Sequence, residues 1–212
     1  MRVTLTFDNG PSATTAEVLD ILSANGIRST FFVVGDQLKQ PGARELAERA
    51  LAEGHWIGNH TLTHSVQFGD ADDPEVAARE IGETQDLIGP MAHPDKLFRP
   101  AGGGGILDRR LFSRAAINYL LQHRYTCVLW SCVPHDWDQP DTWVQRCLSE
   151  VATQPWSVVV VHDLPTGAMS HLPELLDGLN TLGAEVLQEF PDSCVPIRNG
   201  VPTGPLEHLT RP

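Results

Sequence analysis

The sequence predicts an α/β protein whose parallel strands form a closed or nearly closed barrel. Segments of strand length alternate with segments of helical period about seven times along the chain. The segment at residues 157–161, SVVVV, is almost continuously apolar, which is typical of a parallel strand covered on both faces. Polar residues that can do chemistry collect where the predicted strands end. An open, doubly wound sheet is the alternative that these observations leave open.

The first two strand and helix units show the pattern clearly. Residues 2–9 form the first predicted strand, and residues 14–26 form a helix whose apolar residues recur at helical spacing and whose last residue, Gly26, suits a C-terminal stop. Residues 27–35 form the second predicted strand, and residues 41–54 form the second helix. The order strand, helix, strand, helix favours parallel strands joined by crossover helices.

The same alternation continues to residue 190, and no linker or low-complexity segment interrupts it, so we expect a single domain over residues 1–212. Residues 195–212 are rich in proline without a clear period, and we expect them to wrap the surface or fray. The remaining predicted elements are strand 55–60, helix 74–89, strand 96–103, helix 108–123, strand 126–133, helix 141–154, strand 157–163, helix 172–183 and strand 184–190.

Charge and composition exclude some classes of function. The formal net charge is -12, and no basic stripe is visible, so we expect no nucleic-acid partner. No segment approaches the ~18–20 apolar residues of a membrane span, and the chain enters a strand at once without an apolar signal region. We therefore expect a cytoplasmic protein without membrane contact, or a secreted or envelope protein if a leader precedes this sequence. The sequence gives no indication of the oligomeric state.

The four cysteines are scattered and form no C-x-x-C pair. We interpret them as core or surface thiols, and the sequence indicates neither a shared metal nor a disulfide framework.

Candidate functional residues recur at the carboxyl ends of the predicted strands. In parallel α/β folds the loops at this edge converge on a ligand, so these residues are expected to share one site. They are Asp8, Asn9, His60, His64, Arg99, Asp136 and His162.

His60 and His64, in the segment HTLTH, are the first candidate metal ligands. Four residues apart, two imidazoles share one face of a helical turn and can converge on one cation. In a chain with nine histidines such a pair alone is a modest signal, so the pair needs a third ligand. Asn9 is placed to offer its side-chain oxygen, although an amide is a weaker donor than a carboxylate because it carries no charge. Taken alone, Asn9 would read as a turn residue before Gly10.

The other strand ends carry groups suited to acid, base and positioning roles. Arg99 can orient a carboxylate through two hydrogen bonds, and the glycine run that follows it offers backbone N–H groups or simply a pliable loop. His162 can act as a general acid if Asp136 fixes its tautomer and supports its protonated form. Asp163, which follows, reads as a turn residue.

Five segments, in order and spacing, resemble the motifs of the polysaccharide deacetylases, also called carbohydrate esterase family 4 or the NodB-homology domain. They are TFDNGPS, GNHTLTH, FRPAGG, HDW and VVVVHD, and they extend from Val3 to about residue 162. The resemblance implies a distorted (β/α) barrel, a divalent metal that is usually zinc, with cobalt, nickel or manganese as alternatives, and an acetylated carbohydrate as the substrate.

The resemblance also implies roles for residues that match the motifs. Asp8 corresponds to the general base and His162 to the general acid, while Arg99 orients Asp8 and Asp136 supports His162. Where the family usually has aspartate and an aromatic residue, this chain has Asn9 and Gly102. The implied metal ligands are Asn9, His60 and His64, and the implied substrate contacts are Pro100, Gly102, Trp137 and Val160.

The leading hypothesis is therefore a metal-dependent hydrolase that removes acetyl groups from N-acetylated amino sugars or oligosaccharides of the chitooligosaccharide or peptidoglycan type. One alternative is a hydrolase of another small amide or of an O-acetyl ester such as acetylxylan, with weak or no metal dependence. Another is a catalytically silent carbohydrate-binding protein. Joint retention of the base, both histidines, the arginine and the acid pair disfavours this last alternative.

Overall fold

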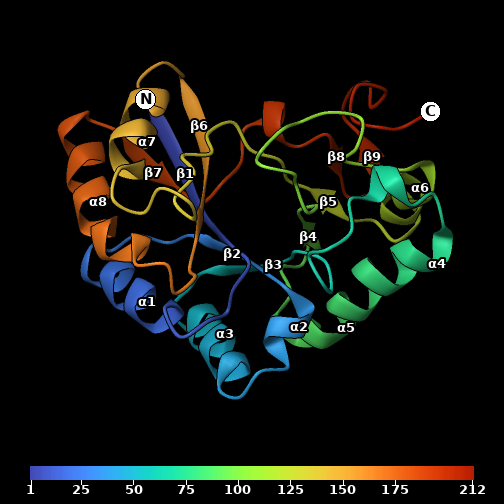
Figure 1. Cartoon of the computed structure of the whole chain (residues 1–212), viewed down its shortest axis with the longest axis horizontal. Helices are drawn as coiled ribbons and strands as arrows, with labels where there is room; N and C mark the ends of the chain where they lie inside the picture. The colour runs from blue at the N-terminus through green and yellow to red at the C-terminus, as the bar shows by residue number, and fades with distance from the viewer.

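The structure, a computed structural model, describes all 212 residues and contains one curled sheet of nine strands with helices around its outside (Figure 1). Hydrogen-bonded neighbours follow the order β6-β1-β2-β3-β4-β5-β8-β9, and β7 pairs with β1. The strands are β1 (Arg2–Asp8), β2 (Thr30–Val33), β3 (Trp56–Asn59), β4 (Leu97–Phe98), β5 (Thr126–Cys127), β6 (Trp156–His162), β7 (Glu185–Leu187), β8 (Ile197–Arg198) and β9 (Val201–Pro202).

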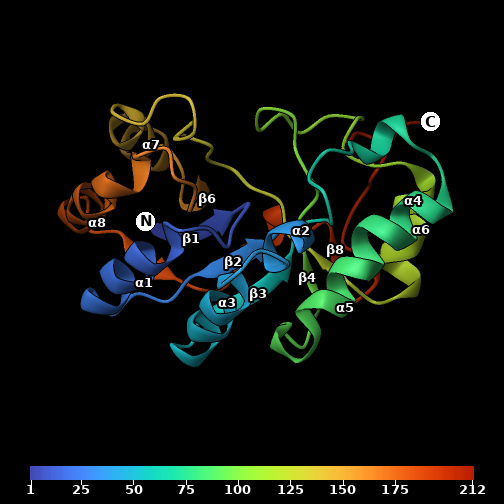
Figure 2. The same cartoon turned by 60° about the horizontal axis from the view of Figure 1, so that its bottom comes forward.

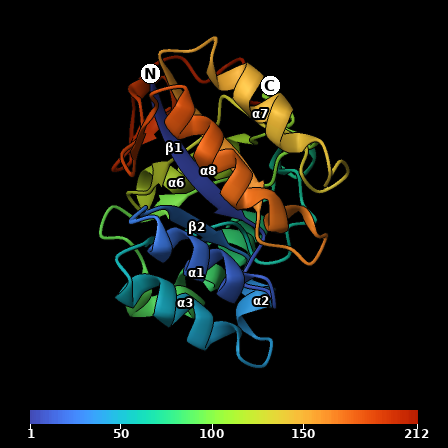
Figure 3. The ribbon, with the colours of Figure 1, turned by 90° about the vertical axis from the view of Figure 1, so that its left-hand side faces the viewer.

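The helices form two groups, and the strands run between them (Figure 2). On one side α7, α8, α1 and α3 pack in a row across β1 and β2 (Figure 3), and on the other side lie α4, α5 and α6. The first group covers one cluster of buried apolar side chains, to which Ile88 of α5 also belongs, and α4 and α6 cover a second cluster. The helices are α1 (Thr15–Ala24), α2 (Gly35–Leu38), α3 (Ala43–Ala52), α4 (Pro74–Ala77), α5 (Thr84–Ile88), α6 (Arg114–Gln122), α7 (Trp143–Val151) and α8 (Leu172–Thr181), with a π-helical segment at Ala78–Glu83.

The predicted α/β class is confirmed. Strands β1 to β5 lie side by side in chain order, β6 pairs with the free edge of β1, and all these pairings are parallel. A doubly wound sheet would instead reverse its strand order at a switch point. The strand order is therefore that of a sheet curling toward closure, and the doubly wound alternative is wrong.

A closed barrel of seven parallel strands is not confirmed. The sequence predicts one strand at residues 126–133, but only β5 is regular. Beyond β5 the backbone N–H groups of Val128, Leu129 and Cys132 donate to the carbonyls of three separate segments, at Phe98, Cys194 and Val158. The hydrogen-bond partner of this segment changes at almost every residue. The segment therefore forms no continuous ladder of hydrogen bonds with β6, and the pairing is limited to a single bridge between Cys132 and Val159. The result is a curled half-barrel.

The C-terminal segment joins the sheet through residues 197–202, so the expectation that residues 195–212 wrap the surface or fray is wrong for this part, whereas residues 203–212 form no strand and are mostly exposed. β8 and β9 form an antiparallel hairpin that pairs with β5, and this makes the sheet mixed. Val195 and Ile197 are fully buried. The hairpin covers the edge that β5 would otherwise expose, so the apolar residues of this segment have a packing role.

The predicted helix at residues 74–89 forms as α4 and α5 joined by the π-helical segment. The side-chain amide of Asn59 donates to the carbonyl of Ile81 at 2.8 Å, and the Thr84 hydroxyl donates to the carbonyl of Glu80 at 3.0 Å. Side chains that enter the carbonyl ladder of a helix in this way favour a local widening. The π-helical segment thereby ties this helix to the end of β3.

All four cysteines are free and buried, as a core role for these thiols predicts. Two of them, Cys132 and Cys147, lie with their sulfur atoms 4.0 Å apart. None of the helices combines the length and the apolar character needed to cross a membrane.

Replacing Ile197 with alanine should lower the free energy of unfolding by about 2–5 kcal/mol, because it opens a cavity at a buried position. Val201→Ala, in the same hairpin, should change it by less than about 0.5 kcal/mol, because this side chain is 63% exposed. Urea unfolding followed by circular dichroism measures both. Small, equal effects would mean that the hairpin contributes nothing to the core.

Candidate active site

The predicted site residues meet in one pocket at the carboxyl ends of β1, β3 and β6. Asp8 and His162 are direct neighbours across the β1–β6 pairing, which fixes the last residues of the two strands side by side. The pocket has a volume of about 310 Å³. Predicted residues that line it are Asp8, Asn9, His60, His64, Gly102, Trp137, Val160 and His162, and further lining residues are Gly104, Gly105, Trp130, Val133 and Leu164.

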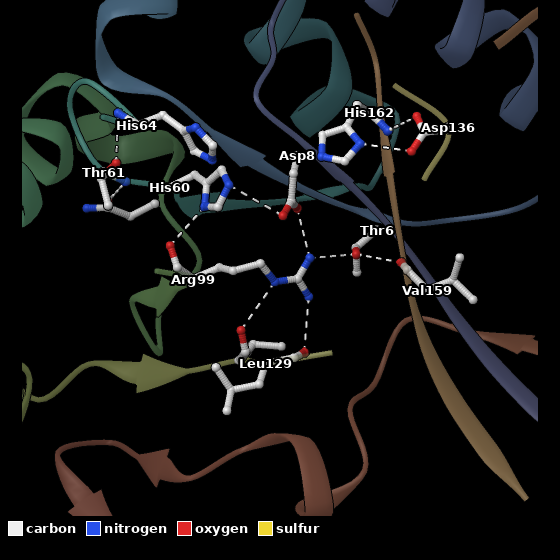
Figure 4. A network of polar contacts seen from close by, with 12 residues as sticks. Thr6, Asp8, His60, Thr61, His64, Arg99, Leu129, Asp136, Val159 and His162 are labelled. Carbon is white, nitrogen blue, oxygen red and sulfur yellow. Dashed lines mark hydrogen bonds and ion pairs between the residues drawn. The ribbon is translucent and has the colours of Figure 1, made fainter. Parts of the chain in front are cut away.

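Arg99 lies beneath the pocket and fixes one oxygen of Asp8. Its Nη1 donates to Asp8 Oδ1 at 2.8 Å and to the Thr6 hydroxyl at 2.7 Å, and its other nitrogens donate to the carbonyls of Val128 and Leu129. The guanidinium is fully buried and lies 4.0 Å from the ring centroid of Phe32. Burial lowers the pKa of Arg99, and the charge of Asp8 opposes that effect. Asp8 is therefore held rigidly with its second oxygen, Oδ2, directed to the histidine side of the site (Figure 4).

His60 presents a lone pair to the site. Its Nδ1 lies 2.9 Å from the carbonyl oxygen of Arg99, which can only accept a hydrogen bond, so Nδ1 carries the proton. Its Nε2 faces Asp8 Oδ2 at 3.4 Å. Burial lowers the pKa of His60 to about 3, against the opposing charge of Asp8, and burial also lowers the pKa of His64. Both imidazoles are therefore neutral, which is the form that binds metals.

The two histidine rings converge, with centroids 4.7 Å apart, but residues 60–64 do not form the helical turn that the spacing predicts. Thr61 and His64 have left-handed backbone conformations, with φ of 68° and 54°. The Thr61 N–H donates to the side chain of Asn59, and the His64 N–H donates to the hydroxyl of Thr61. These side-chain contacts hold a compact loop that turns His64 back toward His60.

Asn9 is the clearest indication of a missing partner. Its side-chain oxygen is buried and accepts no hydrogen bond from the protein, and the residue lines the same pocket as the two histidines. A buried acceptor without a donor is costly unless something else satisfies it. Two neutral imidazoles and an amide oxygen fit a divalent metal such as zinc or cobalt. All three donors are uncharged.

His162 and Asp136 form a pair on the opposite side of Asp8 (Figure 4). Asp136 Oδ1 accepts from His162 Nδ1 at 2.9 Å, and Asp136 Oδ2 accepts from the His162 backbone N–H at 2.8 Å. Nδ1 therefore carries a proton, and Nε2 is left for proton transfer. Burial lowers the pKa of His162, but the hydrogen bond and charge of Asp136, with the charges of Asp8 and Asp163, outweigh it and raise the pKa above its ordinary value.

The glycine run after Arg99 is packed, so its interpretation as a merely pliable loop is incomplete. A Cβ on Gly102 would lie 2.5 Å from the indole of Trp130, and a Cβ on Gly105 would lie 3.0 Å from Val133. Trp130 also donates from Nε1 to the carbonyl of Gly105 at 2.7 Å. These glycines let the loop lie directly on the apolar wall of the pocket.

Two residue assignments need correction. Pro100 is buried and does not line the pocket, whereas Gly102 does. Asp163 is fully buried, so it is not an ordinary turn residue. The sequence did not identify Trp130 and Val133 as pocket residues, because apolar residues in a predicted strand are expected to belong to the hydrophobic core. For Asp163, the sequence did offer a signal, because an acidic residue directly follows the histidine at the end of a predicted strand.

Residues 1–128 match the family model described as polysaccharide deacetylase. The chain belongs to this family. The matched range contains Asp8, His60 and Arg99, whereas Asp136 and His162 follow it. The match to the polysaccharide deacetylase model therefore covers the part of the site around Asp8, and the pair of His162 and Asp136 comes from the rest of the chain.

Individual relatives support the same membership. A chitooligosaccharide deacetylase of Rhizobium leguminosarum bv. trifolii is 35% identical over 165 residues, which are 76% of this chain and 71% of the relative. A peptidoglycan-N-acetylglucosamine deacetylase of Bacillus cereus is 28% identical over 201 residues, which are 91% of this chain and 71% of the relative. A family 4 acetyl xylan esterase from Clostridium thermocellum, solved with a cobalt ion, has a TM-score of 0.71 and 26% identity and covers 89% of this chain and 88% of its own.

Replacing Arg99 with methionine should lower the free energy of unfolding by about 3–5 kcal/mol, because Asp8 is left as a buried charge without its partner. Arg198 is a matched control, since its Nη2 lies 2.8 Å from Asp192 Oδ1 but both side chains are exposed. Arg198→Met should cost less than about 1 kcal/mol. Chemical unfolding at pH 7 measures the difference, and equal costs would show that burial does not decide the strength of the Asp8–Arg99 pair.

Proposed function

We propose that the protein is a metal-dependent hydrolase that removes acetyl groups from N-acetylated amino sugars or oligosaccharides of the chitooligosaccharide or peptidoglycan type. The observation that carries the proposal is the arrangement around Asp8. A carboxylate held by Arg99 stands between a cluster of neutral metal donors and a histidine supported by Asp136. Hydrolysis of an amide needs these components together: a base for water, an electrophile for the carbonyl and an acid for the leaving amine.

His60, His64 and Asn9 would hold a divalent ion, with zinc as the first choice and cobalt, nickel or manganese as alternatives. When bound, such an ion polarises the acetyl carbonyl and increases the acidity of water. The cobalt ion in the acetyl xylan esterase supports this assignment. The neutral ligand set predicts weaker binding than a set that includes a carboxylate.

Asp8 is the proposed base. Arg99 holds Oδ1, so Oδ2 remains free to take a proton from a water molecule in the pocket. His162 is the proposed acid, because Asp136 fixes its tautomer and leaves Nε2 to protonate the departing amine. The two groups end adjacent strands, so a substrate lying over the β1–β6 edge contacts both.

The apolar side of the pocket is suited to the methyl group of an acetyl substituent. Trp137 lies edge-on to His162 with ring centroids 4.9 Å apart, and Val160 precedes His162 by two residues on the same strand face. Trp130, Val133 and Leu164 extend this wall. An apolar wall beside the reacting groups excludes water other than the one that reacts.

Hydrolysis of an O-acetyl ester, as in acetylxylan, is the second candidate, and the similarity to the acetyl xylan esterase favours it. The two candidates differ in the demand on His162, because an amine must be protonated to leave and an alkoxide needs less assistance. Another small amide is a further alternative.

Acetate release tests the proposal directly. Protein loaded with zinc or cobalt should release acetate from chitooligosaccharides more rapidly than from acetylxylan, and a chelator should abolish the activity. His64→Ala should lose metal and activity together, whereas His208→Ala, at an exposed position, should retain both. Full activity after complete removal of metal would contradict the mechanism, and no release from any acetylated sugar would favour another small amide as the substrate.

Asp136→Asn should move the alkaline limb of the pH–rate profile to lower pH. The amide oxygen can still accept one of the two hydrogen bonds from His162, but the amide NH2 cannot accept the other and the charge is lost, so burial then lowers the pKa of His162. Stability gives a second readout. Because the pKa of His162 is higher in the folded protein than its ordinary value of about 6.5, His162 contributes its full stabilisation at pH values below about 6.5. This contribution is lost as the pH rises through the folded-state pKa. The wild type should lose stability over that interval and the variant should not, as measured by urea unfolding at each pH. An unchanged alkaline limb would exclude His162 as the acid.

A further inference from the structure

The ligands of the candidate metal site carry no negative charge of their own. An imidazole binds a metal in its unprotonated form and an amide is uncharged, so His60, His64 and Asn9 are all neutral donors. The charge of Asp8 is offset by Arg99 at 2.8 Å. Asp136 is likewise engaged by His162. Negative charge near three neutral ligands strengthens their hold on a cation that has given up part of its hydration.

Asp163 is a buried carboxylate that contacts no reacting group in the proposed mechanism, although its charge contributes to the raised pKa of His162. It is fully buried, one of its oxygens has no hydrogen-bond partner, and the other accepts from the hydroxyl of Thr15. The carboxylate lies against Gly10, the residue after Asn9, so closely that a Cβ on Gly10 would overlap it. The hydroxyl of Ser12 donates to the backbone carbonyl of Asp163 and ties the same turn to the end of β6.

Asp163 directly follows the proposed acid, His162, but its carboxylate packs against the turn that carries the candidate ligand Asn9. Gly10 has room for no side chain because the carboxylate occupies that space, and the turn that Asp163 supports carries Asn9. The unpartnered oxygen is not paired with any cationic side chain of the protein. In a buried environment a charge is screened less than at the surface, so its effect extends past the atoms that it touches.

We propose that Asp163 supplies, from behind the Gly10 turn, the negative charge that the three neutral metal donors lack. The inference rests on the proposed metal-dependent function. Asp163 is not itself a ligand, because it does not line the pocket. It acts on the cation through its field and on Asn9 through the turn that it supports. The metal site formed by Asn9, His60 and His64 thereby has a carboxylate nearby although its three ligands are uncharged.

The test is the affinity of the metal-free protein for zinc and for cobalt, measured by calorimetric titration at pH 8. Burial raises the pKa of Asp163 to about 6, so the carboxylate is ionised at this pH. Asp163→Asn keeps the shape and removes the charge, and the affinity should fall by about 10- to 100-fold. Asp163→Ser, a smaller neutral residue that can still pair with Thr15, should show the same loss and serves if the asparagine variant does not fold.

Two control variants separate charge from shape. Thr15→Val removes the hydrogen bond to Asp163 and keeps the charge, so it should weaken metal binding much less than Asp163→Asn. Asp36→Asn removes an exposed charge and should leave the affinity unchanged. The double variant Asn9→Asp with Asp163→Asn moves the charge into the ligand set and should bind at least as tightly as the wild type.

The outcomes distinguish this inference from the proposed function. If the wild type binds metal and Asp163→Asn binds equally well, Asp163 does not supply the charge and only this inference fails. If Thr15→Val weakens binding as much as Asp163→Asn, Asp163 acts only by holding the turn, and the inference is again wrong. If the wild type binds no metal, the proposed function fails and this inference fails with it.

Discussion

The buried ion pair between Arg99 and Asp8 is the constraint on which the rest of the site depends. Removing a guanidinium from water is expensive, and this one recovers the cost only because its nitrogens reach Asp8, Thr6 and two backbone carbonyls in a fixed geometry. The backbone carbonyl of the same residue fixes the tautomer of His60. Arg99 thus orients Asp8, the proposed base, with its side chain and His60, a candidate metal ligand, with its backbone.

The sheet extends this constraint to His162, the proposed acid. Parallel pairing of β1 with β6 places Asp8 beside His162, and a shift of register by one residue would turn one of them away from the pocket. The carboxylates are then distinguished by their partners. Asp8 is paired with a permanent cation and Asp136 with a histidine that can lose its proton, so the two buried carboxylates have different electrostatic surroundings.

The sequence was sufficient for the parts of the site that follow from strand direction. Parallel strands end at one edge, so Asp8, His60, Arg99 and His162 could be assigned to a common site from their positions alone, and the structure brings them together. What the sequence did not reveal depends on contacts between distant segments. The backbone beyond β5 changes partners at successive residues, and the C-terminal hairpin is buried because β5 needs an edge partner.

Gly102 stands where the family usually has an aromatic residue, and the effect of this difference depends on which side chains surround the position. Any side chain at this position would meet the indole of Trp130, which already forms the wall of the pocket there. An aromatic side chain at position 102 would occupy the space of Trp130. Trp130, from a different segment, therefore supplies the aromatic surface of the pocket in this chain. The same reasoning applies to Asn9. Asn9 lacks the negative charge of an aspartate at this position. The residues packed around it have to be considered as well, and among them the carboxylate of Asp163 lies against Gly10.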